Sequence, residues 1–157
     1  MNNFPTRYDE SMFMSCQKRQ EQLKDLFSKL TTKEAQYQKI IEMGRSLPPM
    51  DPEHKIDANL VRGCQSQMFL VTRLENNKLF FECASDALIS AGLAALLLYI
   101  YDGQSPETLL KCPPTALKEI GIPTLLSPSR SNGLASLYTR MQQAALTFSL
   151  SPKIKPR

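Results

Sequence analysis

The sequence has 157 residues, of which 42% are hydrophobic and 22% are charged, and its formal net charge is +4 at pH 7. These values are ordinary for one soluble globular domain with a single core. A membrane-spanning helix is not expected, because the longest apolar stretch, residues 87–101, is too short to cross a bilayer. A secretory signal is not expected either, since Arg7, Asp9 and Glu10 fall where its apolar core would lie. We therefore expect a cytoplasmic protein.

Positive charge gathers toward the C-terminus. No acidic residue occurs from residue 120 onward, and residues 150–157 form a basic tail. A nucleic-acid-binding protein usually has a denser basic face with interleaved aromatic residues. The sequence contains no Trp and no helix-turn-helix or RNA-recognition signature. We therefore expect a solvated basic tail and no nucleic-acid partner.

The first third of the sequence predicts two helices behind a polar extension. Residues 1–20 show no steady hydrophobic period, which predicts a flexible or partly helical extension. Apolar residues then recur at helical spacing over residues 23–30. Thr31 followed by Glu34 has the pattern of a capping box for a second helix, which Pro48 ends.

The middle of the sequence predicts three strands. Leu60 and Val61 begin a short extended segment, and two runs rich in β-forming residues, 67–74 and 78–84, flank a turn at 75–77. Such runs pair readily as a hairpin. The pattern therefore predicts a small three-stranded antiparallel sheet.

The rest of the sequence predicts helices. Residues 87–101 are apolar nearly all round, which is typical of a central helix covered on most sides. Gly92 within this run is expected to permit a close approach of another backbone. A short helix begins at Pro106, and residues 134–148 carry one apolar face of a long final helix. The order of elements indicates an α+β fold, with the sheet covered by helices.

Four cysteines are candidates for chemistry, but their spacing does not predict a metal site. Cys16, Cys64, Cys83 and Cys112 lie far apart, and His54 is the only histidine. Zinc and iron–sulfur sites usually take at least two ligands from one short loop, as in C-x-x-C. Cys83 alternates with apolar residues on a predicted strand face, which indicates a core position.

Cys64 differs from the other cysteines because it follows Gly63 at the end of a predicted strand. Glycine allows a sharp turn that presents the next side chain, and the free amides of such a turn can stabilise a thiolate. From the residues alone, a functional thiol and an incidental one both remain open.

Four segments resemble the SufE family, the sulfur-acceptor partners of cysteine desulfurases. "LVRGCQSQMFLV" resembles the family's active-site segment, and three further segments occur in the family's order and spacing: "IIEMGRSLPPM", "SDALISAGLAALLLYIYDGQSPETLL" and "LSPSRSNGL". The resemblance covers residues 21–149, which we take as a SufE-like domain.

The resemblance implies that Cys64 accepts persulfide sulfur from a cysteine desulfurase, stimulates that enzyme and passes the sulfur to iron–sulfur cluster assembly. The chain would then be a sulfurtransferase-type carrier with a covalent cysteine persulfide, an activator rather than a self-sufficient enzyme. Pyridoxal phosphate would belong to the desulfurase, so no cofactor is expected on this chain. The implied fold is the one shared with scaffold proteins of the IscU type.

The resemblance also implies roles for residues around Cys64. Gly63, Gln65, Ser66 and Asp86 would support the loop and the site. Asp86 is also expected to cap the next helix, with Ser85 as the alternative cap. Arg130 would hold the loop through backbone carbonyls or lie near the transferred sulfur. Met68 and Phe69 would form the wall of an apolar cavity into which the thiol turns, which would raise its pKa.

Three other functions remain as alternatives: an iron–sulfur cluster scaffold of the related fold, a thiol oxidoreductase, and a non-catalytic interaction protein. The scaffold would need several cysteines at one end of the fold, and the oxidoreductase would be favoured by a C-x-x-C motif. The sequence predicts neither feature. The partners implied are a desulfurase and a downstream sulfur acceptor or scaffold, with no membrane, and the sequence leaves a homodimer open.

Overall fold

The computed structural model describes residues 3–150, with side chains from residue 13 onward. From residue 151 on, the basic tail expected over residues 150–157 lies outside the described residues.

Helices flank a single β-hairpin in chain order. The elements are α1 (Asn3–Ser28), α2 (Lys33–Arg45), the one-turn 3-10 helices Pro52–His54 and Asp57–Asn59, β1 (Met68–Glu75), β2 (Lys78–Ser85), α3 (Leu88–Tyr101), α4 (Pro106–Lys111), α5 (Thr115–Glu119), α6 (Ile122–Leu125) and α7 (Pro128–Leu150). The arrangement confirms the α+β class. Within residues 3–150, no helix has both the length and the apolar character needed to cross a bilayer.

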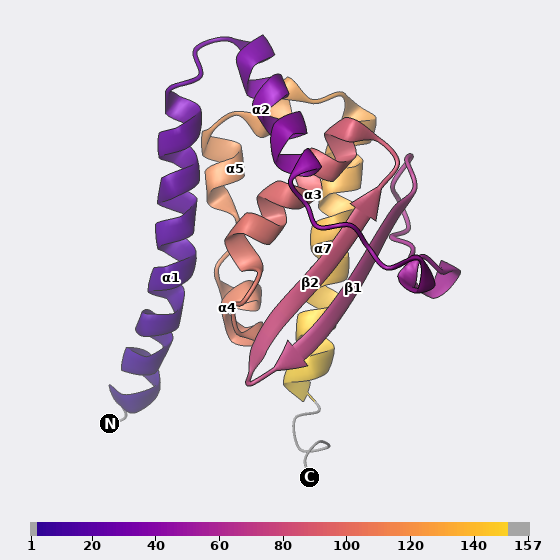
Figure 1. Ribbon diagram of the computed structural model, residues 1–157. Coiled ribbons are helices and arrows are strands. Elements are labelled where there is room, and N and C mark those ends of the chain that lie inside the picture. Colours follow the sequence, from indigo (N-terminus) through magenta and orange to yellow (C-terminus); the bar gives the residue numbers. More distant parts are fainter. Residues whose placement is uncertain (1–2, 151–157) are drawn as a thin grey trace.

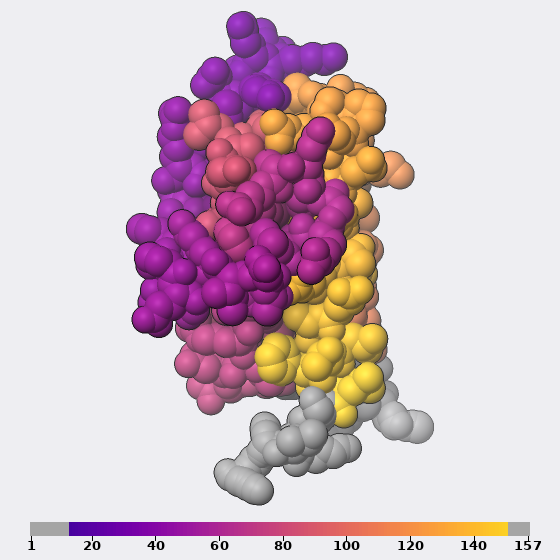
Figure 2. Space-filling view, turned by 90° about the vertical axis from the view of Figure 1, so that its right-hand side faces the viewer, coloured from indigo at the N-terminus to yellow at the C-terminus, as the bar shows by residue number. Residues whose placement is uncertain are grey.

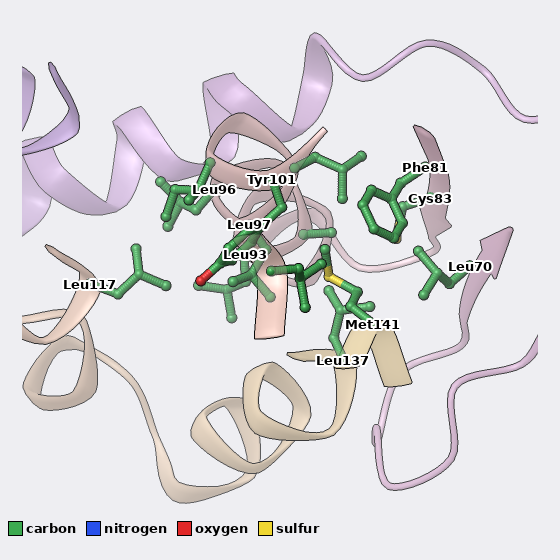
Figure 3. Close-up of a cluster of buried hydrophobic side chains, with 14 of the residues drawn as sticks. Leu70, Phe81, Cys83, Leu93, Leu96, Leu97, Tyr101, Leu117, Leu137 and Met141 are labelled. Carbon is green, nitrogen blue, oxygen red and sulfur yellow. The ribbon is translucent and has the colours of Figure 1, made fainter. Parts of the chain in front are cut away.

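Helix α3 is the centre of the core, as its apolar sequence predicted. It lies between α1 and the hairpin in Figure 1, and α2, α7 and β2 also pack against it. Its side chains Leu96, Leu97 and Ile100 have no exposed surface. Figure 3 shows α3 side chains meeting those of the hairpin and α7, among them Leu70, Phe81, Cys83, Leu93, Leu97, Leu137 and Met141. Each fully buried side chain of this size contributes about 1.5–3 kcal/mol to stability.

Helices α2 and α3 cross at two glycines with almost no space between their backbones. A Cβ atom on Gly92 would overlap the backbone oxygen of Ile40, and one on Gly44 would lie 2.5 Å from the backbone nitrogen of Gly92. The expected role of Gly92 is confirmed. The N-cap of α2 is Thr32, one residue later than predicted, and its hydroxyl accepts from the backbone N–H of Ala35.

The sheet has two strands rather than the predicted three. Strands β1 and β2 pair antiparallel from Met68↔Ser85 to Glu75↔Lys78, and the turn residues Asn76 and Asn77 both have positive φ. The segment expected to form the third strand makes only one isolated bridge, Leu60↔Phe69. Its ladder ends there because the chain turns at Gly63, whose φ is +90°.

We expected an extension over residues 1–20 and a domain from residue 21. Helix α1 instead continues across this boundary without a break. The guanidinium of Arg19 donates to the backbone oxygens of Tyr99, Ile100 and Asp102, with the shortest distance, 2.6 Å, to Asp102. A cation at the C-terminal end of α3 is favourable because the helix dipole is negative there. The last turns of the expected extension are therefore packed on the core.

The crossing of α2 and α3 makes the Gly92→Ala variant a test of the fold. The new methyl group must push two backbones apart, so we expect the free energy of unfolding to fall by about 1–3 kcal/mol. Gly133→Ala is the matched control, because its Cβ would meet its nearest neighbour, Cys64 Sγ, at 3.6 Å. Urea unfolding measures both variants. A Gly92→Ala protein as stable as the wild type would contradict the close crossing.

Candidate functional site

Gly63 sets the position of the Cys64 loop. Its φ of +90° lies in the left-handed region that favours glycine. A Cβ at this position would also overlap the hydroxyl oxygen of Ser136 on α7. Glycine therefore lets the chain turn while touching α7, which confirms the sharp turn expected here, and the next side chain is directed toward the start of that helix.

The Cys64 thiol faces the first turns of α7. Its side chain is half-buried, and its S–H donates to the backbone oxygen of Gly133 at a sulfur–oxygen distance of 3.6 Å. Burial raises the thiol pKa above its ordinary value, because desolvation disfavours the thiolate. In this position Cys64 is a protonated thiol and a weak nucleophile.

A small cavity lies beside this thiol. Its volume is about 10 Å³, close to the space that one water molecule needs. Apolar side chains from three elements and the backbone of Gly133 supply part of the wall, and polar side chains from the loop, α3 and α7 supply the rest. The lining residues are Cys64, Gln65, Ser66, Met68, Ser90, Leu93, Ser129, Arg130, Gly133, Leu134 and Leu137.

A chain of hydrogen bonds joins the loop to both helices that border the cavity. The hydroxyl oxygens of Ser66 and Ser90 lie 2.8 Å apart, and Arg130 donates from Nη1 to the Ser90 hydroxyl, also at 2.8 Å. Arg130 therefore reaches the loop through Ser90, and not through backbone carbonyls, the first of its two expected roles. It also lines the cavity that Cys64 faces, and its second expected role, a position near the transferred sulfur, stays a prediction. Ser90 was not predicted as a site residue, although it is the polar interruption in the apolar stretch 87–101.

Asp86 hydrogen bonds to the loop, and it does not cap α3 as we also expected. Its carboxylate accepts from the backbone N–H of Gln67 at 3.1 Å, and its own N–H donates to the Gln67 carbonyl at 3.3 Å. The N-cap of α3 is Ala87, which has no side-chain hydrogen bond to the helix. The reason is position: Asp86 follows β2 directly opposite the loop that leads into β1, so its carboxylate meets the free amide there.

The remaining predicted residues divide between the cavity and the surface around it. Met68 lines the cavity, whereas Phe69 is buried but does not. Successive side chains of a strand point to opposite faces, so these two neighbours cannot share one wall. Gln65 lines the cavity and is exposed.

Arg140 of α7 holds the segment that enters the loop, a contact that sequence patterns do not reveal. Its guanidinium donates to the backbone oxygens of Leu60 at 2.7 Å and Ala58 at 2.9 Å. Figure 2 shows this face of the molecule, where the purple and magenta segment before β1 lies beside the yellow surface of α7. The loop is thus fixed on both sides of Cys64, by Arg140 before it and by Ser66 after it.

Other titratable groups lie apart from the cavity. His54 pairs with Glu82 of β2 at 2.7 Å between Nδ1 and Oε1, and neither side chain lines the cavity. Cys83 is buried on β2, where burial raises its thiol pKa to about 12. Among the side chains that the structure describes, no three from His, Cys, Asp and Glu gather where they would hold a metal ion.

Comparison with known proteins shows the family of the chain. Residues 21–145 match the SufE family model, described as an Fe–S metabolism associated domain. A SufE-like protein of Synechocystis is 35% identical over 124 residues, which is 79% of this chain and 78% of the relative. The sulfur acceptor protein CsdE of Escherichia coli is 37% identical over 119 residues, 74% of this chain and 81% of the relative.

A solved structure has the same fold. The solution structure of a hypothetical protein from Thermus thermophilus is similar with a TM-score of 0.67 and 28% sequence identity. The match covers 82% of this chain and 96% of that one.

The raised pKa of Cys64 predicts a shifted pH dependence for its alkylation. Because the thiolate is the reactive form, the rate for the isolated protein should rise at a higher pH than the rate for free cysteine, and at pH 7 it should be lower. Iodoacetamide labelling, quantified on the peptide that contains Cys64, measures the profile. A midpoint at or below that of free cysteine would show that the thiol is not sheltered.

The contact between Ser66 and Ser90 predicts that Ser90→Ala loosens the loop. The variant removes the hydrogen bonds of Ser90 to Ser66 and from Arg130, of which the first holds the loop directly. One such bond is worth about 1 kcal/mol, so alkylation of Cys64 should accelerate by up to about fivefold at fixed pH. Ser129→Ala is the control, since Ser129 also lines the cavity but bonds only to Ser127, at 3.5 Å. Equal rates for the two variants would mean that Ser90 does not restrain the loop.

Proposed function

Because the chain belongs to the SufE family, we propose that it accepts sulfur on Cys64 from a cysteine desulfurase and carries it toward iron–sulfur cluster assembly. The observation that carries this proposal is a thiol that faces a cavity with room for about one additional atom. The name of the Escherichia coli relative, sulfur acceptor protein, supports the same role.

The proposed reaction is an exchange between a thiolate and a persulfide. The Cys64 thiolate attacks the terminal sulfur of a persulfide on the desulfurase, and a new sulfur–sulfur bond forms on Cys64. The sulfur–sulfur bond of the desulfurase breaks, and its cysteine leaves as a thiolate that takes up a proton. One sulfur atom moves without an external oxidant or reductant.

The position of the thiol supports two states of the Cys64 loop, one in which the thiol is turned inward and protected and one in which it is turned outward and reacts. Turned inward, Cys64 donates to Gly133 and its raised pKa keeps it protonated. When the desulfurase docks, the loop turns outward, the thiol is hydrated, and its pKa falls toward the ordinary value. The hydrogen bond between Ser66 and Ser90 that must break costs about 1 kcal/mol, which a protein interface readily supplies.

The cavity then protects the product. After loading, the loop turns back and the terminal sulfur lies among Met68, Leu93 and Leu137, where small reductants have little access. Sulfur removal clears the desulfurase for its next cycle, so the chain stimulates turnover. No cofactor is needed here, since the carbon–sulfur bond of cysteine is broken in the partner with pyridoxal phosphate.

Incubation with a matching desulfurase and cysteine tests the proposal. The wild-type chain should gain the mass of one sulfur atom and stimulate cysteine turnover, and Cys64→Ser should do neither, because a hydroxyl does not attack sulfur under these conditions. Cys83→Ala, which removes a buried thiol of β2, should behave as the wild type.

Two results would contradict the proposal. One is sulfur uptake and stimulation by Cys64→Ser at the wild-type level. The other is a stable iron–sulfur cluster on the isolated chain after anaerobic reconstitution, which would point to a scaffold.

A further inference from the structure

A second group of thiols lies outside the Cys64 site. Cys16 of α1 has no exposed surface, and Cys112, directly after α4, is 6% exposed. The side-chain amide nitrogen of Gln20 lies 3.7 Å from the Cys16 sulfur and 3.6 Å from the Cys112 sulfur. One amide therefore contacts both sulfurs, and the two thiols lie close enough for each to shift the pKa of the other. Neither lines the cavity beside Cys64.

The two thiols have opposite chemical character. Interaction with the Cys16 thiol, with help from Gln20, lowers the pKa of Cys112 against the effect of burial. The same interaction, together with burial, raises the pKa of Cys16. Cys112 is therefore the more acidic thiol of the pair, which suits it to act as the nucleophile and Cys16 to act as the resolving thiol.

The backbone around both cysteines is already held in place. Gln20 accepts from the Ala116 N–H at 2.8 Å and donates to the Pro113 oxygen at 3.1 Å, so α1 is bonded to the segment that contains Cys112. Arg19, the residue of α1 before Gln20, donates to the backbone at the end of α3. A covalent bond between the sulfurs would join elements that these hydrogen bonds already hold in contact.

We propose that Cys16 and Cys112 form an intramolecular disulfide when the protein meets hydrogen peroxide, and that this bond fastens α1 to the segment between α4 and α5. Cys112 attacks the peroxide, the oxygen–oxygen bond breaks, and a sulfenic acid forms as the first water leaves. The Cys16 sulfur then attacks the sulfenic sulfur and displaces a second water that carries away the Cys16 proton. The two thiols lose two electrons and the peroxide is reduced to two waters.

This site is independent of sulfur acceptance at Cys64. Cys16 precedes the residues 21–145 that match the family, so the thiol pair depends on the N-terminal part of α1 in this chain. The other two thiols are less suited to react. Burial keeps Cys83 protonated, and the Cys64 S–H donates to Gly133. The bond would leave Cys64 free.

The experiment uses the full chain carrying Cys64→Ser, so that the half-buried site thiol does not react. The reduced protein is treated with hydrogen peroxide, then denatured, alkylated and analysed by intact mass and peptide mapping. We expect a loss of two hydrogens, one remaining alkylated thiol at Cys83, and a cross-linked pair of peptides containing Cys16 and Cys112. The melting temperature of the oxidised protein should rise by roughly 5–10 °C, because the cross-link restricts the unfolded chain.

Matched variants in the same background define the pair. Cys16→Ala and Cys112→Ala should not form the intramolecular cross-link, and Cys83→Ala should form it as the parent does, with circular dichroism confirming that each is folded. Two results with the Cys64→Ser parent alone would overturn the proposal. One is that all three remaining thiols are still alkylated after peroxide treatment, and the other is a cross-link to Cys83. A cross-linked protein with an unchanged melting temperature would overturn the claim that the bond fastens α1.

Discussion

Helix α3 has apolar side chains around most of its circumference, and burying them determines how the other elements pack. A helix with apolar residues on every side must be covered on every side, and α1, α2, the hairpin and α7 supply that cover. The Cys64 loop and the start of α7 therefore meet over the same helix. Ser90 and Leu93 of α3 consequently line the cavity beside the thiol.

The four cysteines differ in chemical character because their surroundings differ. Desolvation alone raises the pKa of Cys64, whereas a neighbouring S–H lowers the pKa of Cys112. The loop that carries Cys64 is held by a few hydrogen bonds, to Ser90, Asp86 and Gly133. Bonds of this kind contribute about 1 kcal/mol each, so a docking partner can open the loop while the free protein keeps it closed.

Local patterns predicted much of the fold and part of the site. The apolar run of α3, the close approach at Gly92 and the turn at Gly63 each follow from the character of a few adjacent residues. The hydrogen bonds of Arg130 and Asp86, and the contacts of Cys16 and Cys112 with Gln20, depend on which distant residues meet, and spacing along the chain does not show this. The prediction of a third strand was wrong for a related reason. The β-forming residues at 60 and 61 do not reveal that the turn at Gly63 ends the pairing after one bridge.

The most direct test of the central claim is to locate the transferred sulfur in the wild-type chain. The chain is recovered from a mixture with desulfurase and cysteine, alkylated, digested and sequenced by tandem mass spectrometry. We expect an additional sulfur on the peptide that contains Cys64 and none on the peptides of Cys16, Cys83 and Cys112. Additional sulfur on another cysteine, or none anywhere while the desulfurase turns over, would contradict this claim.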